Sequence, residues 1–176
     1  MPQIEISSAA FDFLKTRAKP LEDTTVSVVD RLISEFETLL KGNPSTHSGV
    51  LINAIDAPSM KHTTVIDAKI DGVAASQNYW NNILEDTIRI CVNKGADPST
   101  VRKLLSANIK ENSHSENGFR FIPEANFSFQ GLEANRAFKN IVSLITSFHV
   151  PINITVKWPN RDDVTMPNAT AQIIYP

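Results

Sequence analysis

The sequence predicts an α+β protein in two parts, and three observations support this fold class. Apolar residues recur at helical spacing in two long stretches, 80–92 and 134–148, whereas shorter stretches alternate between apolar and polar residues as strands do. Helices and alternating strands are mixed along the chain in the manner of α+β domains. The length of 176 residues fits one ordinary domain with a small module attached. We therefore expect a strand-helix-helix module at 1–42, a linker at 43–62, and an α+β domain with antiparallel strands and two long helices at 63–176.

The N-terminal module begins with a short alternating strand, Gln3–Ile6, followed by helical patterns at 9–18 and 26–40. A unit of about 40 residues buries its own apolar surface poorly. Strand-helix-helix units usually solve this problem by pairing the strand with that of a second copy, as ribbon-helix-helix proteins do. We therefore expect a homodimer whose contact residues are Ile4, Ile6, Phe11, Leu14, Val29, Leu32 and Ile33.

The stretch MPQIEISSAAFDFLKTRAKPLEDTTVSVVDRLI resembles the N-terminal oligomerisation module of SeqA-type negative modulators of replication initiation. The shared features are the I-E-I strand, the cap at Ser7-Ser8, the spacing of Phe11 and Leu14, and a second helix that closes on VDRLI. The resemblance implies self-association rather than reading of bases. The strand agrees with this, because Glu5 faces phosphates with the wrong charge.

The second domain is expected to form around the segment 63–96, which has the pattern of a strand, a tight turn at Asp71-Gly72 and a helix. Burial is worth roughly 1.5–3 kcal/mol for each large apolar side chain, so this helix is expected to seed the main core. The stripe that it buries is Trp80, Ile83, Leu84, Thr87, Ile88, Cys91 and Val92.

Further strands and a second long helix complete the predicted domain. Phe119–Ile122 and Asn126–Phe129 alternate on either side of Pro123, which indicates a hairpin, and 151–158 is the clearest strand. Gly131 precedes the long helix, whose predicted buried stripe is Ala134, Ala137, Phe138, Ile141, Ile145 and Phe148. The intervening segment 112–118 is a polar loop without core-forming residues.

The block 118–138 is similar in outline to the part of SeqA-type C-terminal domains that reads modified DNA. This similarity rests on an aromatic strand, an Asn-containing loop and a helix that ends at Phe148-His149-Val150-Pro151, with Asn126 as the counterpart of a family asparagine. Amides at Asn126 and Gln130 can bond bidentately to adenine, and Arg120, Arg136 and Lys139 can meet phosphates.

Two other interpretations of the same block stay open. The alternating phenylalanines can form a stacking surface for unpaired bases. They can also be the buried face of a strand pair, with the amides as turn formers. The four residues concerned are Phe119, Phe121, Phe127 and Phe129.

The charge of the chain is nearly balanced, with a net value of −2, which argues against a strongly basic nucleic-acid binder. The two halves differ, however. In 1–42 seven acidic residues outnumber five basic ones, whereas in 98–161 eight basic residues face four glutamates. This pattern fits either a modest basic face on the second half or an ordinary solvated surface.

A rival hypothesis is a Mg²⁺-dependent nuclease, because Asp56 followed by Asp67-Ala68-Lys69 has the order of carboxylates and lysine used by such enzymes. The alternative is that Asp67, Lys69 and Asp71 are the solvent face of a strand.

The histidines lack metal-ligand spacing, and no nucleotide-binding loop is present in the sequence. No catalytic residue, metal or cofactor is therefore expected.

The lone Cys91 predicts a buried reduced thiol, and no apolar run approaches the roughly 18 residues of a membrane span. We expect a cytoplasmic, non-enzymatic homo-oligomer that binds DNA through its second domain and has no membrane partner. A protein-assembly component that binds another protein is the third possibility.

Overall fold

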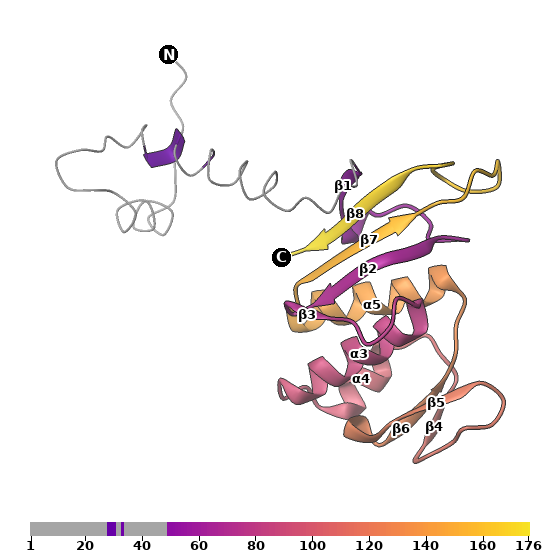
Figure 1. Ribbon diagram of the computed structural model, residues 1–176. Coiled ribbons are helices and arrows are strands. Elements are labelled where there is room, and N and C mark those ends of the chain that lie inside the picture. Colours follow the sequence, from indigo (N-terminus) through magenta and orange to yellow (C-terminus); the bar gives the residue numbers. More distant parts are fainter. Residues whose placement is uncertain (1–27, 31–32, 34–48) are drawn as a thin grey trace. The chain divides into compact units, whose positions relative to one another are not determined.

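The computed structural model describes residues 28–30, 33 and 49–176 (Figure 1). The chain divides into two compact units, Met1–Thr46 and His47–Pro176. In the first unit the described residues are helical, with Val28 buried and Val29 and Ile33 exposed. The predicted first strand and the remaining dimer contacts lie outside the described residues: Ile4, Ile6, Phe11, Leu14 and Leu32.

The second unit contains a five-stranded sheet, sheet A, in the order β1-β8-β7-β2-β3. Only the β1–β8 pair is parallel, and the other pairs are antiparallel. The ladder between β2 and β7 contains an irregularity between Val65 and Asp67. The strands are β1 Val50–Asn53, β2 Thr64–Ile70, β3 Val73–Ala74, β7 Ile152–Lys157 and β8 Thr170–Tyr175.

Three helices lie on one side of sheet A: α3 Trp80–Asn93, α4 Pro98–Leu104 and α5 Ala134–Phe148. Helices α3 and α5 pack against each other, and the rings of Trp80 and Phe138 meet edge-on at 5.5 Å between centroids. The predicted helical pattern at 80–92 is confirmed, because Trp80, Ile83 and Leu84 are among its buried residues. The pattern of α5 is confirmed in the same way, since Phe138 and Ile141 are buried.

A second, three-stranded sheet, sheet B, lies on the other side of the helices from sheet A (Figure 1). Its order is β4-β6-β5, with β4 Ile109–Glu111, β5 Phe119–Ile122 and β6 Phe127–Gln130. The short 3-10 helix η2, Pro123–Ala125, joins β5 to β6 and ends at Asn126, which has the left-handed φ of 51°. The α+β fold class and the hairpin are therefore confirmed.

The predicted linker at 43–62 needs a correction, because its described part belongs to the second unit. Strand β1 pairs with β8, the 3-10 helix η1, Ala54–Asp56, follows it, and Met60 is fully buried. Gly49 permits this pairing, since a Cβ at that position would lie 2.8 Å from the carbonyl oxygen of Thr170. The domain thus begins before the predicted residue 63, because the apolar patch LINAI supplies an edge strand and a turn.

Candidate functional site

The register of sheet B places its phenylalanines on opposite faces. Phe121 is paired with Ser128 and Ile122 with Phe127, and directly paired residues point to the same side of a sheet. Phe127 and Phe129 face the helices and are buried, as in the strand-pair interpretation. Phe119 and Phe121 are on the other face and are half-buried. The hypothesis that all four phenylalanines share one stacking surface is therefore wrong.

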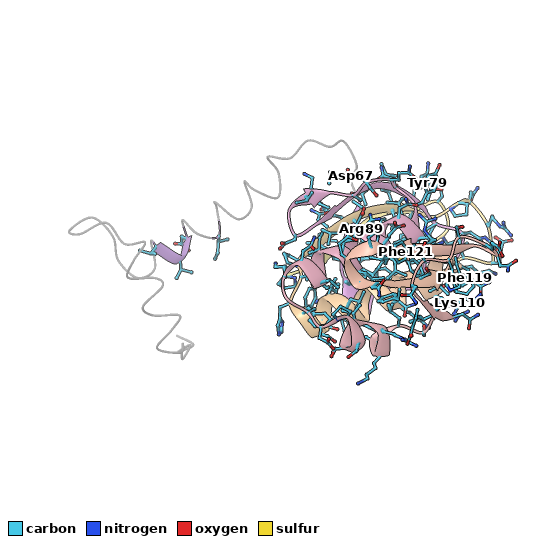
Figure 2. All side chains as sticks on the ribbon, turned by 90° about the horizontal axis from the view of Figure 1, so that it is seen from below. Asp67, Tyr79, Arg89, Lys110, Phe119 and Phe121 are labelled. Atoms are coloured by element: carbon cyan, nitrogen blue, oxygen red, sulfur yellow. The ribbon has the colours of Figure 1, made fainter. Side chains whose placement is uncertain are left out.

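The outer face of sheet B, as we call the side away from the helices, carries Lys110, Phe119, Phe121, Ser128 and Gln130, and His114 of the following loop lies against it. The ammonium nitrogen of Lys110 lies 4.6 Å from the centroid of the Phe119 ring, within the range of a cation–π contact. The ring of His114 is tilted against the same phenylalanine, with 6.3 Å between centroids. Figure 2 views the domain from this side and shows Lys110 beside Phe119. An exposed cation and half-buried aromatic rings thus share one surface, part of which the loop 112–118 covers.

The loop 112–118 folds back on this face and is held there by Ser128. The hydroxyl of Ser128 donates to the carbonyl of Asn112 over 2.8 Å and accepts from the backbone N–H of His114 over 2.9 Å. Ser128 is fully buried, and Asn112 and Asn117 take left-handed φ values of 64° and 55°. The contribution of His114 and Ser128 was not foreseen from the sequence, because it depends on this loop returning to β6.

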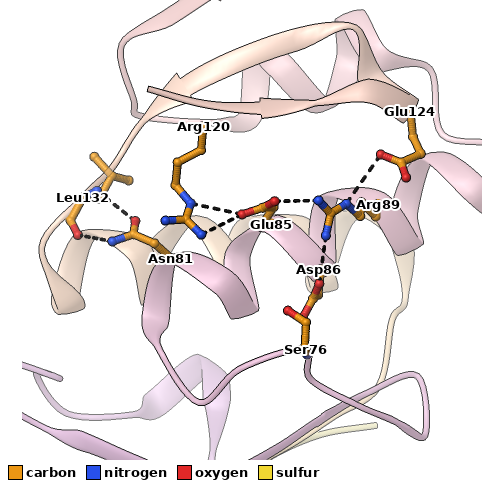
Figure 3. A network of polar contacts seen from close by, with 8 residues as sticks. All are labelled: Ser76, Asn81, Glu85, Asp86, Arg89, Arg120, Glu124 and Leu132. Carbon is orange, nitrogen blue, oxygen red and sulfur yellow. Dashed lines mark hydrogen bonds and ion pairs between the residues drawn. The ribbon is translucent and has the colours of Figure 1, made fainter. Parts of the chain in front are cut away.

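Arg120, predicted to meet phosphates, points toward α3 instead. Its Nε and Nη2 atoms donate to Glu85 over 3.0 and 2.9 Å. Glu85 also accepts a hydrogen bond from Arg89 (Figure 3). Arg89 in turn contacts Asp86 and Glu124. Asp86 also accepts a hydrogen bond from the backbone N–H of Ser76. This network ties α3 to β5, to η2 and to the segment before the helix. The position of Arg120 therefore does not support its predicted contact with nucleic acid.

The two predicted adenine-binding amides are engaged within the domain. The Gln130 side chain accepts from Asn108 over 2.7 Å and donates to the carbonyl of Asn117 over 3.0 Å. Asn126 ends η2 and donates to Asn112 over 3.4 Å. Bidentate binding of adenine by Gln130 would require both of its bonds to break. The interpretation of these amides as turn and loop formers fits the geometry better.

Arg136 and Lys139 are exposed on α5 but lie in different surroundings. Arg136 donates to the carbonyl of Ser106 over 2.6 Å, in the segment that leads into β4. Lys139 instead lines a groove beside η1. These two side chains therefore contact different segments, and neither has a contact with a strand of sheet B. The five residues predicted to bind DNA are therefore not assembled into one site.

Three bases of 98–161 are neutralised by ion pairs within the domain. Arg102 contacts Glu111 over 3.0 Å, and Arg161 contacts Asp163 over 2.9 Å, in addition to the pair of Arg120. Hydrogen bonds from Lys61 and Arg161 lower the pKa of the Asp163 carboxyl. Five bases of this stretch form no ion pair with a described residue: Lys103, Lys110, Arg136, Lys139 and Lys157.

The residues of the predicted nuclease site do not converge. Asp67 is paired with Thr155 of β7, and both Asp67 and Lys69 are exposed on β2, as the solvent-face alternative expects. Asp56 follows β1, which is separated from β2 by β8 and β7. Three strand spacings amount to about 14 Å, whereas Mg²⁺ binds oxygens at about 2.0–2.1 Å. Within 28–30, 33 and 49–176, no three His, Cys, Asp or Glu side chains are placed to hold a metal ion.

Cys91 is buried in α3, as predicted, and is not in a disulfide. Burial raises the pKa of its thiol to about 11, so the thiol remains protonated at neutral pH. A protonated, buried thiol is a poor nucleophile. Cys91 therefore belongs to the core and not to the candidate site.

The fold and this surface define an α+β domain in which helices separate two sheets, with a small aromatic and basic face on the second sheet. Comparisons with protein-family models, with curated proteins and with solved structures found no match to this chain. In the part of the chain that the structure describes, no helix has the length and apolar character needed to cross a bilayer.

Proposed function

We propose that this protein is a non-enzymatic homo-oligomer that binds nucleic acid, with unpaired bases stacking on the outer face of sheet B. The observation that supports this most directly is the Lys110 ammonium 4.6 Å from the Phe119 ring, with His114 on the same ring. Phe121 extends this surface along β5.

Single-stranded DNA fits this face better than a duplex. Stacking on aromatic side chains contributes about 1–3 kcal/mol per base and needs no free amides, and a nearby lysine neutralises phosphate. Reading of duplex bases relies on amide or guanidinium groups in the grooves, and Gln130 and Arg120 are engaged internally. The proposal therefore keeps DNA as the partner and moves the contact from the predicted amides to the phenylalanines.

Self-association is proposed to occur through the first unit. Val29 and Ile33 are four residues apart, as on one face of a helix, and they are 37% and 52% exposed. The resemblance of residues 1–33 to the SeqA-type oligomerisation module supports the same interface. Pairing two weak nucleic-acid sites in a dimer raises the overall avidity by orders of magnitude.

The test is fluorescence anisotropy of a labelled 20-nucleotide oligo-dT, titrated with the full chain at low salt. The double variant Phe119→Ala and Phe121→Ala is expected to weaken binding at least tenfold, because each stacked base contributes about 1–3 kcal/mol. Lys110→Gln is expected to reduce the slope of the logarithm of the binding constant against the logarithm of the salt concentration by about 0.7. This is the value for one phosphate contact on a single strand.

Two matched variants on sheet A serve as controls for these changes. Val73→Ala removes an exposed apolar side chain and Lys157→Gln an exposed lysine, and both are expected to bind oligo-dT as the wild type does. Equal binding by the double phenylalanine variant, with an unchanged circular dichroism spectrum, would overturn the proposed interface. Preference for a 20-base-pair duplex over oligo-dT would instead favour groove binding.

A further inference from the structure

Strand β1 forms an open edge of sheet A. Among the residues that the structure describes, only β8 pairs with it, so one side of its backbone has no strand partner (Figure 1). Val50 and Leu51 are 54% and 46% exposed, and Ile55, which follows in η1, is 58% exposed. Proteins usually protect such edges with charges, prolines or very short strands. The sequence VLIN contains neither a charge nor a proline, so of these three means only its short length of four residues applies to β1.

A groove of about 490 Å³ lies between α5 and the segment 54–59, which follows β1 directly in the chain. Phe138 and Val142 of α5 and Ala54 and Ile55 of η1 contribute apolar surface to it. Lys139 is the only charged residue in its described lining, and it forms no ion pair with a described residue. The groove thus combines an apolar interior with one positive charge.

We propose that the edge of β1 and this groove bind an extended segment of a partner protein. The segment would add to sheet A as a further strand, with an apolar side chain in the groove and an acidic group facing Lys139. In binding by strand addition, the main-chain hydrogen bonds of the free edge give affinity, and pockets for alternate side chains give specificity. Four residues of β1 span about 13 Å, so the site fits a segment of four to six residues.

Charge distinguishes this occupant from a second copy of the chain. An antiparallel pair of two β1 strands would place Val50 of one copy opposite Asn53 of the other. Asp56, the nearest acid after β1, would then lie beyond residue 50 of the other copy, before the start of that copy's β1. Lys139 of that copy lies at the opposite end of its β1, beside the segment 54–59. Self-pairing leaves the lysine without a carboxylate, and an acidic peptide supplies one.

The experiment uses a fluorescein-labelled octapeptide that alternates isoleucine and threonine and ends in two aspartates, titrated into the full chain. We expect saturable binding, a loss of at least tenfold in affinity for Lys139→Glu and for Ile55→Glu, and no change for Val73→Glu. Val73 is the matched control because it is 64% exposed at the opposite edge of the same sheet. The same peptide with alternate backbone nitrogens methylated cannot pair along that edge and is expected not to bind.

Three results would overturn this inference. These are absence of binding by the unmethylated peptide, equal binding by the methylated peptide, and equal weakening by Val73→Glu. A lower sedimentation coefficient of peptide-free Ile55→Glu relative to wild type would assign the edge to a second copy instead. Binding of oligo-dT by Ile55→Glu reports separately on sheet B, so the two proposals fail independently.

Discussion

The two sheets of the α+β domain carry different side chains on the faces that point away from the helices. On sheet A, Asp67, Thr155 and Gln172 form one row across three strands. On sheet B, the corresponding face carries Phe119 and Phe121 beside Lys110. A polar outer face is what an antiparallel sheet in water normally shows. Half-exposed aromatic rings are the exception, and the comparison therefore directs attention to sheet B as the binding surface.

The largest expected effect separates the two kinds of phenylalanine in sheet B. Phe129→Ala is expected to lower the free energy of unfolding by about 3–5 kcal/mol, because it leaves a cavity among fully buried side chains. Phe121→Ala is expected to cost less than half as much, since that ring is only half-buried. Urea denaturation followed by circular dichroism measures both values. Equal losses would show that the outer ring is also a core residue.

An intermediate effect is expected at Ser128, which connects the loop 112–118 to β6. Ser128→Ala leaves the part-buried His114 N–H without its acceptor, and the cost is expected to lie at the lower end of the range of about 1–3 kcal/mol for unsatisfied buried groups. The amide of His114 is also expected to exchange hydrogen faster. Ser143→Ala is the control, because that hydroxyl bonds only to the exposed Lys139 carbonyl of α5. Unchanged exchange at His114 would mean that the loop keeps its position without Ser128.

The smallest effect is expected on the outer face of sheet A. Thr155→Ala changes a half-exposed side chain in the middle of the polar row, and such substitutions usually alter stability by less than about 0.5 kcal/mol. Binding of oligo-dT is expected to remain that of the wild type. A clear loss of binding in the same anisotropy assay would transfer the nucleic-acid contact from sheet B to sheet A.

The helices and most strands were predictable because their patterns are local. Trp80 and Ile83 in α3, and Phe138 and Ile141 in α5, recur at the spacing of a helix that buries one side. Strand β1 was missed because it has four residues within a segment rich in Gly, Pro and Ser. Its pairing depends on β8, which lies more than a hundred residues later in the chain.

The candidate site was predictable only in part, because pairing across strands decides which side chains meet. Alternation shows that Phe119 and Phe121 share a face, but it does not show that Phe127 and Phe129 take the opposite one. The Glu85 partner of Arg120 is 35 residues away in the sequence, so no local pattern indicates it. The same limit applies to Asp56 and Asp67, whose separation follows from the strand order.

The parallel pairing of β1 with β8 sets an order of events for folding of the second unit. Residues 50–53 are synthesised more than a hundred residues before 170–175, their only strand partner among the described residues. Closing a loop of this length is slow compared with forming helices, because the entropy of closure is lost before the contacts form. Strand β1 is therefore expected to join last and to detach first. Removal of β8 would release both β1 and the outer edge of β7, so within the described residues the strand latest in the sequence holds the earliest one in place.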